Sequence, residues 1–589
     1  NENEELQFVW DSQSDSLTIL SNLLDLYKKG MKKFLNIDIT GSSKEDLDKD
    51  FAALDDRIRE DFWSWSQKNR LYTNSEFAFK DTYNEEAFED NAKVLKEIVN
   101  LLGKYQFRYG HKQQFLGNFF EQLLNTSIKQ ESGQFFTPVP IARFMISSLP
   151  LEEVIDKNLK ENAREILPVV VDYACGSGHF ITEYMDIVQD IVNNYDTSNL
   201  SPTDRNKIIR WKQSGDNTQA QGDFEWAARC VYGIEKDYRL VKTAKVSTFL
   251  NGDGDSNIIC ADGLDKFQSS KYIGHLHSNT SSNNNFNVVV ANPPYSVSSF
   301  KQTLTAEKED FELYDYLTAN SSEIECLFVE RTAQLLKDGG LGAIILPSSV
   351  LSNTGSIYEK TREIILKSFH IRAIANMGPN TFMATGSNTI ILFLERRVDG
   401  DYKRICKLVT QFFQNFLDFS YDNTSKAVQR YIDQAFENVT FEDYISFLKQ
   451  KPGESFASSD YYLELKKAFY QSKVYKDVQK KKVSKDYTEE DRKKELHVLF
   501  YKMVSENEKN KLISFLLTFK KTTIVVKTGE KQGEKAFLGY EFSNRRGQEG
   551  IHYSTNENGN ISSALYDDEN LYENKNKVNY YIRKAFSDE

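Results

Sequence analysis

The chain contains few cysteines and prolines and no long apolar run. Its 589 residues include five Cys and ten Pro, and no two Cys form a C-x-x-C pair. The seven His do not cluster with the Cys, so we expect neither a disulfide framework nor a metal site. No apolar stretch approaches the roughly 20 residues that cross a bilayer, and no signal peptide is evident. These absences favour a cytoplasmic protein whose thiols are reduced and buried.

Positive charge is also scarce over the chain as a whole. Lys and Arg number 74 against 86 Asp and Glu, which gives a formal net charge of −12. The excess of acidic residues argues against nucleic acid binding by the surface as a whole, because phosphate binding needs basic residues. Two stretches, 466–502 and 519–535, are nevertheless rich in Lys. Either a solvated helix or a contact surface for DNA or a protein partner explains them.

Two motifs of energy-dependent and DNA-cleaving enzymes are missing. The sequence has no G-x-x-x-x-G-K-[ST] phosphate-binding loop, and no P-E-x-K-like nuclease pair is evident near the N-terminus. We therefore predict neither translocation nor cleavage from this chain.

Apolar periodicity predicts a helical beginning, a strand-rich middle and a helical end. Residues 1–130 place apolar side chains three and four positions apart. Short β-rich runs then alternate with helical stretches, which favours an α/β fold with a mostly parallel, doubly wound sheet. The predicted strands are 166–174, 231–235, 257–262, 286–292, 341–347, 371–378 and 388–395.

The length suggests roughly three or four domains. We expect a helical domain at 1–130, the sheet-containing domain at 131–400, a helical and partly basic region at 401–536, and a polar, turn-rich connector at 537–589.

The first predicted strand leads into a glycine-containing turn, "VVVDYACGSGHF" at 169–180. Glycines between a strand and a helix let the backbone approach a ligand, and the helix N-terminus favours an electron-rich group. The spacing lacks the third glycine of a dinucleotide site and fits a ligand with an amino-acid end better, with Asp172 placed to meet an ammonium group. An ordinary tight turn is the alternative.

Acidic residues also end the next two predicted strands. Glu235 in "YGIEKD" is placed to accept hydrogen bonds from ribose hydroxyls. Asp262 in "CADGL" could bind an exocyclic adenine amine. A solvated loop acid and a turn-forming Asp-Gly are the respective alternatives.

The fourth predicted strand runs into "ANPPYSVSSF" at 291–300. Proline is excluded from the middle of a sheet because it has no N–H, so the strand must stop at about Ala291. The following residues then form a rigid turn at the carboxyl edge of the sheet, where ligands of open α/β sheets bind. A strand-terminating turn without chemistry is the alternative.

The acids at successive strand ends, beside the glycine turn, resemble the class I S-adenosylmethionine-dependent methyltransferase fold. This resemblance implies a Rossmann-like, seven-stranded sheet flanked by helical N-terminal and C-terminal domains. It also implies S-adenosylmethionine as the cofactor, bound by Asp172, Ala174, Gly176, Ser177, Gly178, Glu235 and Asp262.

"NPPY" is similar to the motif with which amino-group methyltransferases bind a planar NH₂. The resemblance implies that Asn292, Pro293, Pro294 and Tyr295 form the catalytic motif. The Asn292 side-chain oxygen and the Pro293 carbonyl would accept both amine hydrogens. Tyr295 would stack on the target base, a contact of roughly 1–3 kcal/mol.

The order of the motifs resembles γ-class adenine-N6 DNA methyltransferases. "SGQFFTPVPIARFM" (132–145) precedes the glycine turn, and "FLGNFFEQLL" (115–124) adds a likeness to the modification subunit of type I restriction systems. The residues implied at the methionine end of the cofactor are Gln134, Phe135, Phe136, Thr137 and Pro138. Val139 departs from the pattern, because those subunits often carry a basic residue there.

Two downstream segments extend the resemblance. "GPNTFMATGSNTIILFLERR" (378–397) resembles the corresponding part of type I and fused type II enzymes, where Phe382 is a candidate second wall for the flipped base or a core residue. "FLGYEFSNRRGQEGI" (537–551) resembles what precedes a target-recognition region. From this likeness we expect the methyltransferase portion of a larger, prokaryotic restriction–modification protein.

The resemblance therefore favours a site-specific methyltransferase that acts on N6 of an adenine flipped out of double-stranded DNA. The implied partners are DNA, a specificity module or subunit, and, as a further candidate, a restriction subunit, without a membrane. A protein-glutamine methyltransferase uses the same "NPPY", but such enzymes are small and lack "QFFTPVP". A cytosine-N4 enzyme would more often have Ser in place of Asn292. A non-catalytic DNA-binding scaffold is the third alternative.

Overall fold

The structure, a computed structural model, describes most of the chain from residue 137 to 587. Before that it describes residues 52–73 and isolated positions between 22 and 101. Within 137–587 the undescribed positions are 215–225, 251–256, 270–271, 281–282, 380, 383–387, 485–486, 520–521, 530–531, 543–550, 558 and 560.

The chain divides into two compact units. One comprises Asn1–Leu116, Gln189–Ala228 and Lys245–Ser256, and contains α3 (Asp56–Thr73) and α10 (Pro202–Ser214). The other comprises Gly117–Val188, Arg229–Ala244 and Asn257–Glu589. All predicted site residues belong to the second unit.

The second unit is built on an eight-stranded sheet of order β3-β2-β1-β4-β5-β7-β6-β8. Only β7 runs antiparallel to its neighbours, and all other pairs are parallel. The strands are β1 (Val170–Asp172), β2 (Val231–Glu235), β3 (Asn257–Cys260), β4 (Phe286–Ala291), β5 (Leu336–Pro347), β6 (Phe369–Met377), β7 (Thr389–Arg396) and β8 (Ile524–Lys527). The first seven strands confirm the predicted α/β sheet.

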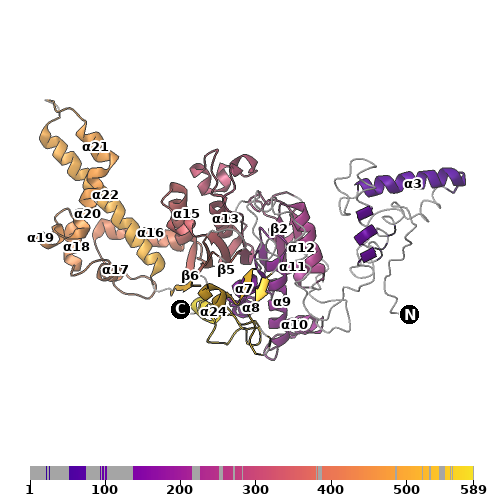
Figure 1. Cartoon of the computed structure of the whole chain (residues 1–589). Coiled ribbons are helices and arrows are strands. Elements are labelled where there is room, and N and C mark those ends of the chain that lie inside the picture. The colour runs from indigo at the N-terminus through magenta and orange to yellow at the C-terminus, as the bar shows by residue number, and fades with distance from the viewer. Residues whose placement is uncertain are drawn as a thin grey trace. The chain divides into compact units, whose positions relative to one another are not determined.

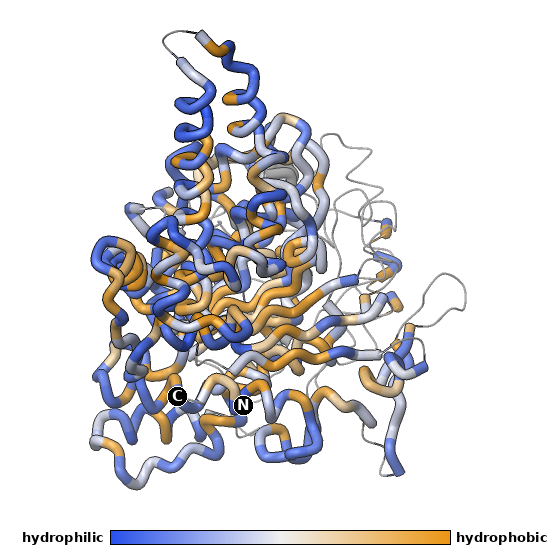
Figure 2. The backbone as a smooth tube through the Cα atoms, turned by 90° about the vertical axis from the view of Figure 1, so that its left-hand side faces the viewer, coloured by the Kyte–Doolittle hydropathy of each residue, from blue (hydrophilic) through white to orange (hydrophobic). Residues whose placement is uncertain are grey.

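The central strands are apolar because both faces of the sheet are covered. Every residue of β1, β2 and β4 is buried, as expected for parallel strands between two layers of helices. Figure 2 shows extended, hydrophobic segments lying side by side. Because β1 pairs in parallel with both β2 and β4, the carboxyl ends of these three strands lie at the same edge of the sheet.

The eighth strand comes from the region that the sequence predicts to be helical. β8 pairs in parallel with β6, from Ala373 beside Ile524 to Asn376 beside Lys527. It forms the edge of the sheet, and Val525 remains 61% exposed.

The sheet-bearing part also contains helices before, between and after the strands. They are α7 (Val139–Ser147), α8 (Leu151–Lys160), α9 (His179–Asn194), α11 (Ala227–Cys230), α12 (Tyr238–Leu250), α13 (Ile324–Leu335), α14 (Ser349–Ser352) and α15 (Ser356–Ser368). Four 3₁₀ turns interrupt the loops: η1 (Gly274–Leu276), η2 (Phe300–Thr303), η3 (Lys308–Asp310) and η4 (Glu312–Tyr316).

The C-terminal segment folds back onto the beginning of this part. It contains α23 (Gln532–Leu538), the antiparallel pair β9 (Tyr540–Phe542) and β10 (Ile551–Tyr553), and α24 (Val578–Ser587). Asn579 donates to Ser147 Oγ at 3.3 Å, and Arg583 donates to the Leu149 carbonyl at 2.9 Å. In Figure 1, α24 lies beside α7 and α8.

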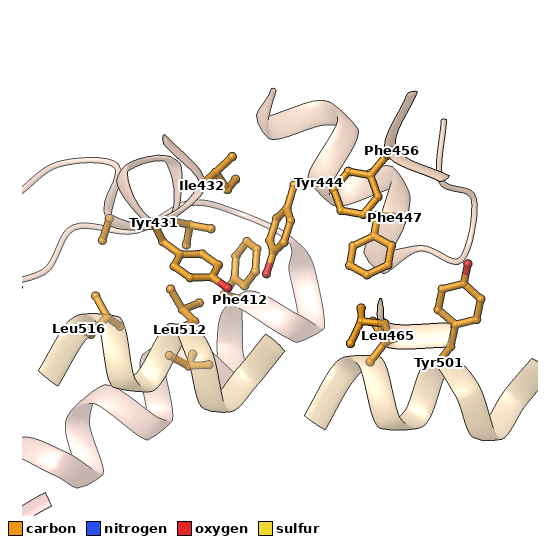
Figure 3. Packing of buried hydrophobic residues seen from close by; sticks show 14 of the residues in the cluster. Phe412, Tyr431, Ile432, Tyr444, Phe447, Phe456, Leu465, Tyr501, Leu512 and Leu516 are labelled. Atoms are coloured by element: carbon orange, nitrogen blue, oxygen red, sulfur yellow. The ribbon is translucent and has the colours of Figure 1, made fainter. Parts of the chain in front are cut away.

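Residues 401–518 form a helical segment with a core of its own, which confirms the helical periodicity predicted after residue 400. It contains α16 (Asp401–Asn415), α17 (Ala427–Ala435), α18 (Phe441–Leu448), α19 (Glu454–Ala457), α20 (Asp460–Gln471), α21 (Lys473–Gln479) and the long α22 (Glu489–Thr518). Aromatic rings fill this core (Figure 3), as in the pair Phe447 and Phe456, whose stacked rings have centroids 4.4 Å apart.

One carboxylate lies inside this aromatic core. Glu508 of α22 is fully buried, and its oxygens accept hydrogen bonds from three tyrosine hydroxyls. Tyr444 donates at 2.8 Å and Tyr431 at 3.1 Å to one oxygen, and Tyr461 donates to the other. Both oxygens of the carboxylate therefore have hydrogen-bond partners in this core, and the Lys511 ammonium group lies 3.9 Å from Oε1.

Candidate active site at one edge of the sheet

A cavity of about 390 Å³ opens at the carboxyl ends of β1, β2 and β4. The predicted site residues among those that line it are Ala174, Gly176, Glu235, Asp262, Asn292 and Pro294. Apolar side chains such as Phe300, Leu304 and Phe328 complete the wall. The sheet thus brings together residues from positions 174 to 294.

The two glycines of the turn after β1 have different roles. Gly176 has φ +52°, and a Cβ there would meet nothing within 4 Å, so its backbone is open to a ligand. Gly178 has φ +90°, and a Cβ there would lie 3.2 Å from the Ala244 Cβ of α12. Gly176 therefore belongs to the cavity, whereas Gly178 permits close helix packing. Ser177 between them is buried.

Asp172 at the end of β1 has unused hydrogen-bonding capacity. It is 1% exposed, and its Oδ1 accepts from the Ala174 N–H at 3.1 Å. Its Oδ2 has no partner among the described residues. Burial, with the nearby Glu235 carboxylate, raises the pKa of Asp172 well above its ordinary value. An unpaired buried oxygen costs about 1–3 kcal/mol, which a ligand with a positively charged donor would offset.

Glu235 at the end of β2 closes the glycine turn. One carboxylate oxygen accepts from the Gly176 N–H at 2.9 Å and the other from the Asp237 N–H at 2.7 Å. Burial raises the pKa of Glu235 despite these bonds. Each oxygen still has a lone pair for a further donor such as a hydroxyl.

Asp262 follows β3 in a short turn. Its Oδ1 accepts from the Leu264 N–H at 3.0 Å, and its Oδ2 lies 2.8 Å from the Lys236 ammonium group. The predicted turn-forming role of this residue is thus present, and the residue also lines the cavity. Lys236, which no motif in the sequence indicates, lines it as well; its only signal is its place directly after Glu235.

The Asn292 amide lies between two hydroxyl groups. Its Nδ2 donates to Thr137 Oγ1 at 3.1 Å, and its Oδ1 accepts from the Tyr295 hydroxyl. Thr137 is itself fixed, because its carbonyl accepts from His179 Nδ1 at 2.8 Å and the next residue, Pro138, is the N-cap of α7. The two predicted motifs around residues 137 and 292 therefore meet.

The prolines and the tyrosine of "NPPY" are mostly enclosed. Pro293 is buried and Pro294 is half-buried and lines the cavity. Tyr295 is 6% exposed. Burial raises the pKa of its hydroxyl well above the ordinary value, and the negative charge of the Glu325 carboxylate raises it further. With its hydroxyl on Asn292, the ring does not present an open face to a base in this conformation.

Other predicted residues lie apart from the cavity or outside the described part. Phe382 is 3% exposed and does not line the cavity, so the structure places it in the core. Gln134, Phe135 and Phe136 lie outside the described residues.

The remaining features concern the state of the cysteines, groups of possible metal ligands and the hydrophobicity of the helices. All five cysteines are free; Cys175, Cys230 and Cys326 are buried, Cys406 is half-buried and Cys260 is exposed. Within the described residues there is no group of three or more His, Cys, Asp or Glu that could hold a metal ion. No helix in that part is long and apolar enough to cross a membrane.

Residues 111–486, more than half of the chain, match the model of the family described as N-6 DNA Methylase. The chain belongs to this family. With the strand order above, this confirms the class I methyltransferase fold and the expectation of an adenine-N6 methylase domain at the level of the family. S-adenosylmethionine dependence is likewise a property of this family and fold.

Curated relatives are similar over part of their length. RM.Eco57I, a type II restriction enzyme and methyltransferase from Escherichia coli, is 23% identical over 432 residues, which cover 64% of this chain and 41% of that protein. The methylase subunit of the type I restriction enzyme EcoEI, also from Escherichia coli, is 23% identical over 322 residues, which cover 54% of this chain and 53% of that subunit. The chain thus spans about half of these relatives or less.

Among solved structures, the methyltransferase subunit of a type I restriction–modification system from Streptococcus thermophilus is 16% identical, with a TM-score of 0.31. The match covers 61% of this chain and 63% of that one.

Proposed function

We propose that this chain transfers a methyl group from S-adenosylmethionine to N6 of an adenine flipped out of double-stranded DNA, as part of a restriction–modification system. The observation that carries the proposal is that Asn292 and the open backbone of Gly176 line one cavity, with the buried Asp172 at the start of the same glycine turn. Membership of the N-6 DNA methylase family supports DNA over the glutamine side chain of a protein as the substrate.

The cofactor fits the residues around the glycine turn. Asp172 would bind its ammonium group, and the unpaired Oδ2 supports this role. Glu235 would accept from the ribose hydroxyls and Asp262 from the adenine amine. Gly176 and Ala174, which line the cavity, would form the backbone rim, and Ser177 and Gly178 would support the cofactor from behind that rim. The segment Gln134–Pro138 would cover the methionine end. When bound, S-adenosylmethionine supplies a methyl group on a positively charged sulfur.

Asn292 and Pro293 would hold the target amine. The Asn292 Oδ1 and the Pro293 carbonyl accept its two hydrogens, so that the nitrogen lone pair points at the methyl carbon. The nitrogen forms the new bond to carbon, the carbon–sulfur bond breaks with its electrons staying on sulfur, and one N–H proton leaves to water. Such alignment of two reactants contributes much of a barrier reduction, and no covalent intermediate on the protein is needed.

Tyr295 would take part by changing its position. In the structure its hydroxyl occupies the oxygen that the target amine needs. The ring would therefore leave Asn292 and stack on the extruded base, whose flipping costs a few kcal/mol. Phe382, which is buried, would contribute a second wall only after a rearrangement.

The flanking regions would bind the duplex and the other components. In this proposal the methyltransferase domain comprises 131–400, between helical regions at 1–130 and 401–536, and 537–589 leads toward a recognition module. The basic 466–535 region would contact phosphates. Sequence reading and cleavage would belong to a specificity module or subunit and a restriction subunit, in line with the restriction enzymes among the relatives.

The test is sequencing of DNA for methylated adenine after expression of the full-length protein together with its neighbouring genes. We expect methylation at one recognition sequence with the wild type and none with Asn292→Ala, while cofactor binding measured by calorimetry survives in the variant. Methylation that persists in Asn292→Ala would refute the assignment of this site, and loss of cofactor binding would show that Asn292 shapes the fold.

A further inference from the structure

We propose that Thr137 is a positioning residue: its hydroxyl fixes which way the Asn292 amide faces. This inference rests on the proposed function, because it concerns the presentation of the Asn292 oxygen to the target amine. Thr137 would then act through Asn292, beyond the cofactor contact that the family resemblance implies for it.

The need for such a residue follows from the shape of a primary amide. The oxygen and the NH₂ group of Asn are similar in size, one accepts and the other donates hydrogen bonds, and the terminal torsion has two broad minima. An amide turned by half a rotation would point two hydrogens at the two hydrogens of the target amine. Methyl transfer therefore requires that Asn292 be held in one of its two orientations.

The two hydroxyls around Asn292 favour the productive orientation. Thr137 Oγ1 accepts from Nδ2 at 3.1 Å, and the Tyr295 hydroxyl donates to Oδ1. A phenol is the more acidic of the two, with a pKa of about 10 in water, so it donates better than it accepts. An aliphatic hydroxyl accepts well. The opposite orientation would reverse both roles and is less favourable.

Thr137 keeps its hydrogen bond with Asn292 when the Tyr295 ring moves away from Asn292 to stack on the base. If the target amine replaces the tyrosine hydroxyl at Oδ1, the hydrogen bond from Nδ2 to Thr137 Oγ1 is unaffected and still fixes the orientation of the amide. Thr137 is 7% exposed. Its carbonyl is bound by His179 at 2.8 Å, directly after the glycine turn, and every residue of α7 except Arg143 is buried. The hydroxyl is thus held in a fixed place relative to both halves of the site.

The experiment compares Thr137→Val, Thr137→Ser and Asn292→Ala with the wild type. Valine has the shape of threonine without the hydroxyl, and serine keeps the hydroxyl. Single-turnover methyl transfer is measured with the full-length protein and its partner subunits at saturating cofactor, on genomic DNA from a host that lacks the gene. Cofactor affinity is measured by calorimetry.

We expect Thr137→Val to lower the transfer rate about 10-fold to 100-fold, in the range of a misplaced reacting group, with cofactor affinity unchanged. Thr137→Ser should restore most of the rate. A wild-type rate in Thr137→Val would overturn the inference while leaving the proposed function standing. So would an equal loss of rate and cofactor affinity, or a serine variant as impaired as the valine variant.

A second measurement tests the contact without any methyl transfer. The side-chain ¹⁵N–¹H₂ signal of Asn292, assigned by its loss in Asn292→Ala, should contain one hydrogen that exchanges slowly with water in the wild type and quickly in Thr137→Val. Equal exchange in both proteins would overturn the inference. If the wild type transfers no methyl to any DNA, the proposed function fails, and this exchange measurement alone decides whether Thr137 orients Asn292.

Discussion

Two carboxyl groups of this protein are buried to nearly the same degree, Asp172 at 1% exposure and Glu508 at 0%, yet their surroundings differ. Three tyrosine hydroxyls share the oxygens of Glu508. Asp172 accepts from the Ala174 N–H, and its second oxygen has no partner among the described residues. Burial alone therefore does not distinguish the two groups; the unused acceptor of Asp172 does, and the residues that follow Asp172 in the chain, Tyr173 and Ala174, line the cavity.

This comparison predicts that Glu508 matters for stability and not for binding. Glu508→Leu should lower the free energy of unfolding by about 3 kcal/mol or more, because the hydroxyls of the buried Tyr431 and Tyr444 and of the half-buried Tyr461 lose their acceptor. Thermal unfolding measures the loss, and cofactor affinity should stay unchanged. Glu506→Leu, on the exposed face of the same helix, is the control and should have little effect. A Glu508→Leu protein as stable as the wild type would contradict the structural role of Glu508.

Asp172 should show the opposite behaviour. Asp172→Asn keeps an acceptor for the Ala174 N–H but removes the charge, so the affinity for S-adenosylmethionine should fall about 10-fold to 100-fold, the value of a charged hydrogen bond. The unliganded protein should become more stable at neutral pH by about 1 kcal/mol, since the amide replaces a buried group that must either keep its charge or take up a proton on folding. Calorimetry and thermal unfolding test both parts, with the exposed Asp190→Asn as control. Unchanged cofactor affinity would contradict the proposed contact.

The pH dependence should separate the two carboxyl groups further. The raised pKa of Asp172 means that its neutral form is favoured in the unliganded fold. Its contribution to stability is complete below its ordinary pKa of about 4 and is lost as pH rises through the raised pKa. An ammonium group needs the carboxylate, so cofactor binding should weaken as pH falls through that raised pKa and should release protons.

The proton release can be measured by calorimetry in buffers of different ionisation enthalpy. Asp172→Asn should remove most of it, leaving the share of Glu235, whose pKa is also raised by burial. Proton release that is the same in the wild type and in Asp172→Asn would show that another group accounts for it.

The smallest effect is expected at one tyrosine of the aromatic core. Tyr444→Phe removes one of the three hydrogen bonds to Glu508, at 2.8 Å, and should cost about 1 kcal/mol of stability. Tyr470→Phe, at a residue that is 52% exposed, should cost almost nothing. A Tyr444→Phe loss as large as that of Glu508→Leu would mean that the three bonds form a single cooperative unit.

The sequence contains enough information to predict the sheet and the two turns at its edge. Strands such as β4 are buried on both faces and appear as continuous apolar runs, and glycine or proline marks where they end. β8 gives no such signal, because its residues alternate between half-buried and exposed and stand among lysines. Its place beside β6 depends on a pairing across about 150 residues.

Contacts between residues that are far apart in the sequence could not be predicted from the sequence either. Residues 137 and 292 are 155 positions apart, so the hydrogen bond between them follows from the tertiary fold and not from a local pattern. The enclosed position of Tyr295 depends on which rotamer its neighbours allow. The tyrosines around Glu508 come from α17, α18 and α20, and nothing in their spacing indicates that they meet one carboxylate.

The course of the chain around β6 has a mechanical consequence. β7 precedes the helical segment and β8 follows it, and these two strands lie on either side of β6. Arg397, just after β7, also donates to the Leu517 carbonyl near the end of α22. The helical segment between these strands is consequently attached to the sheet at both of its ends and not through a single hinge. A force applied to the far end of the segment would therefore be transmitted to the sheet through both attachments.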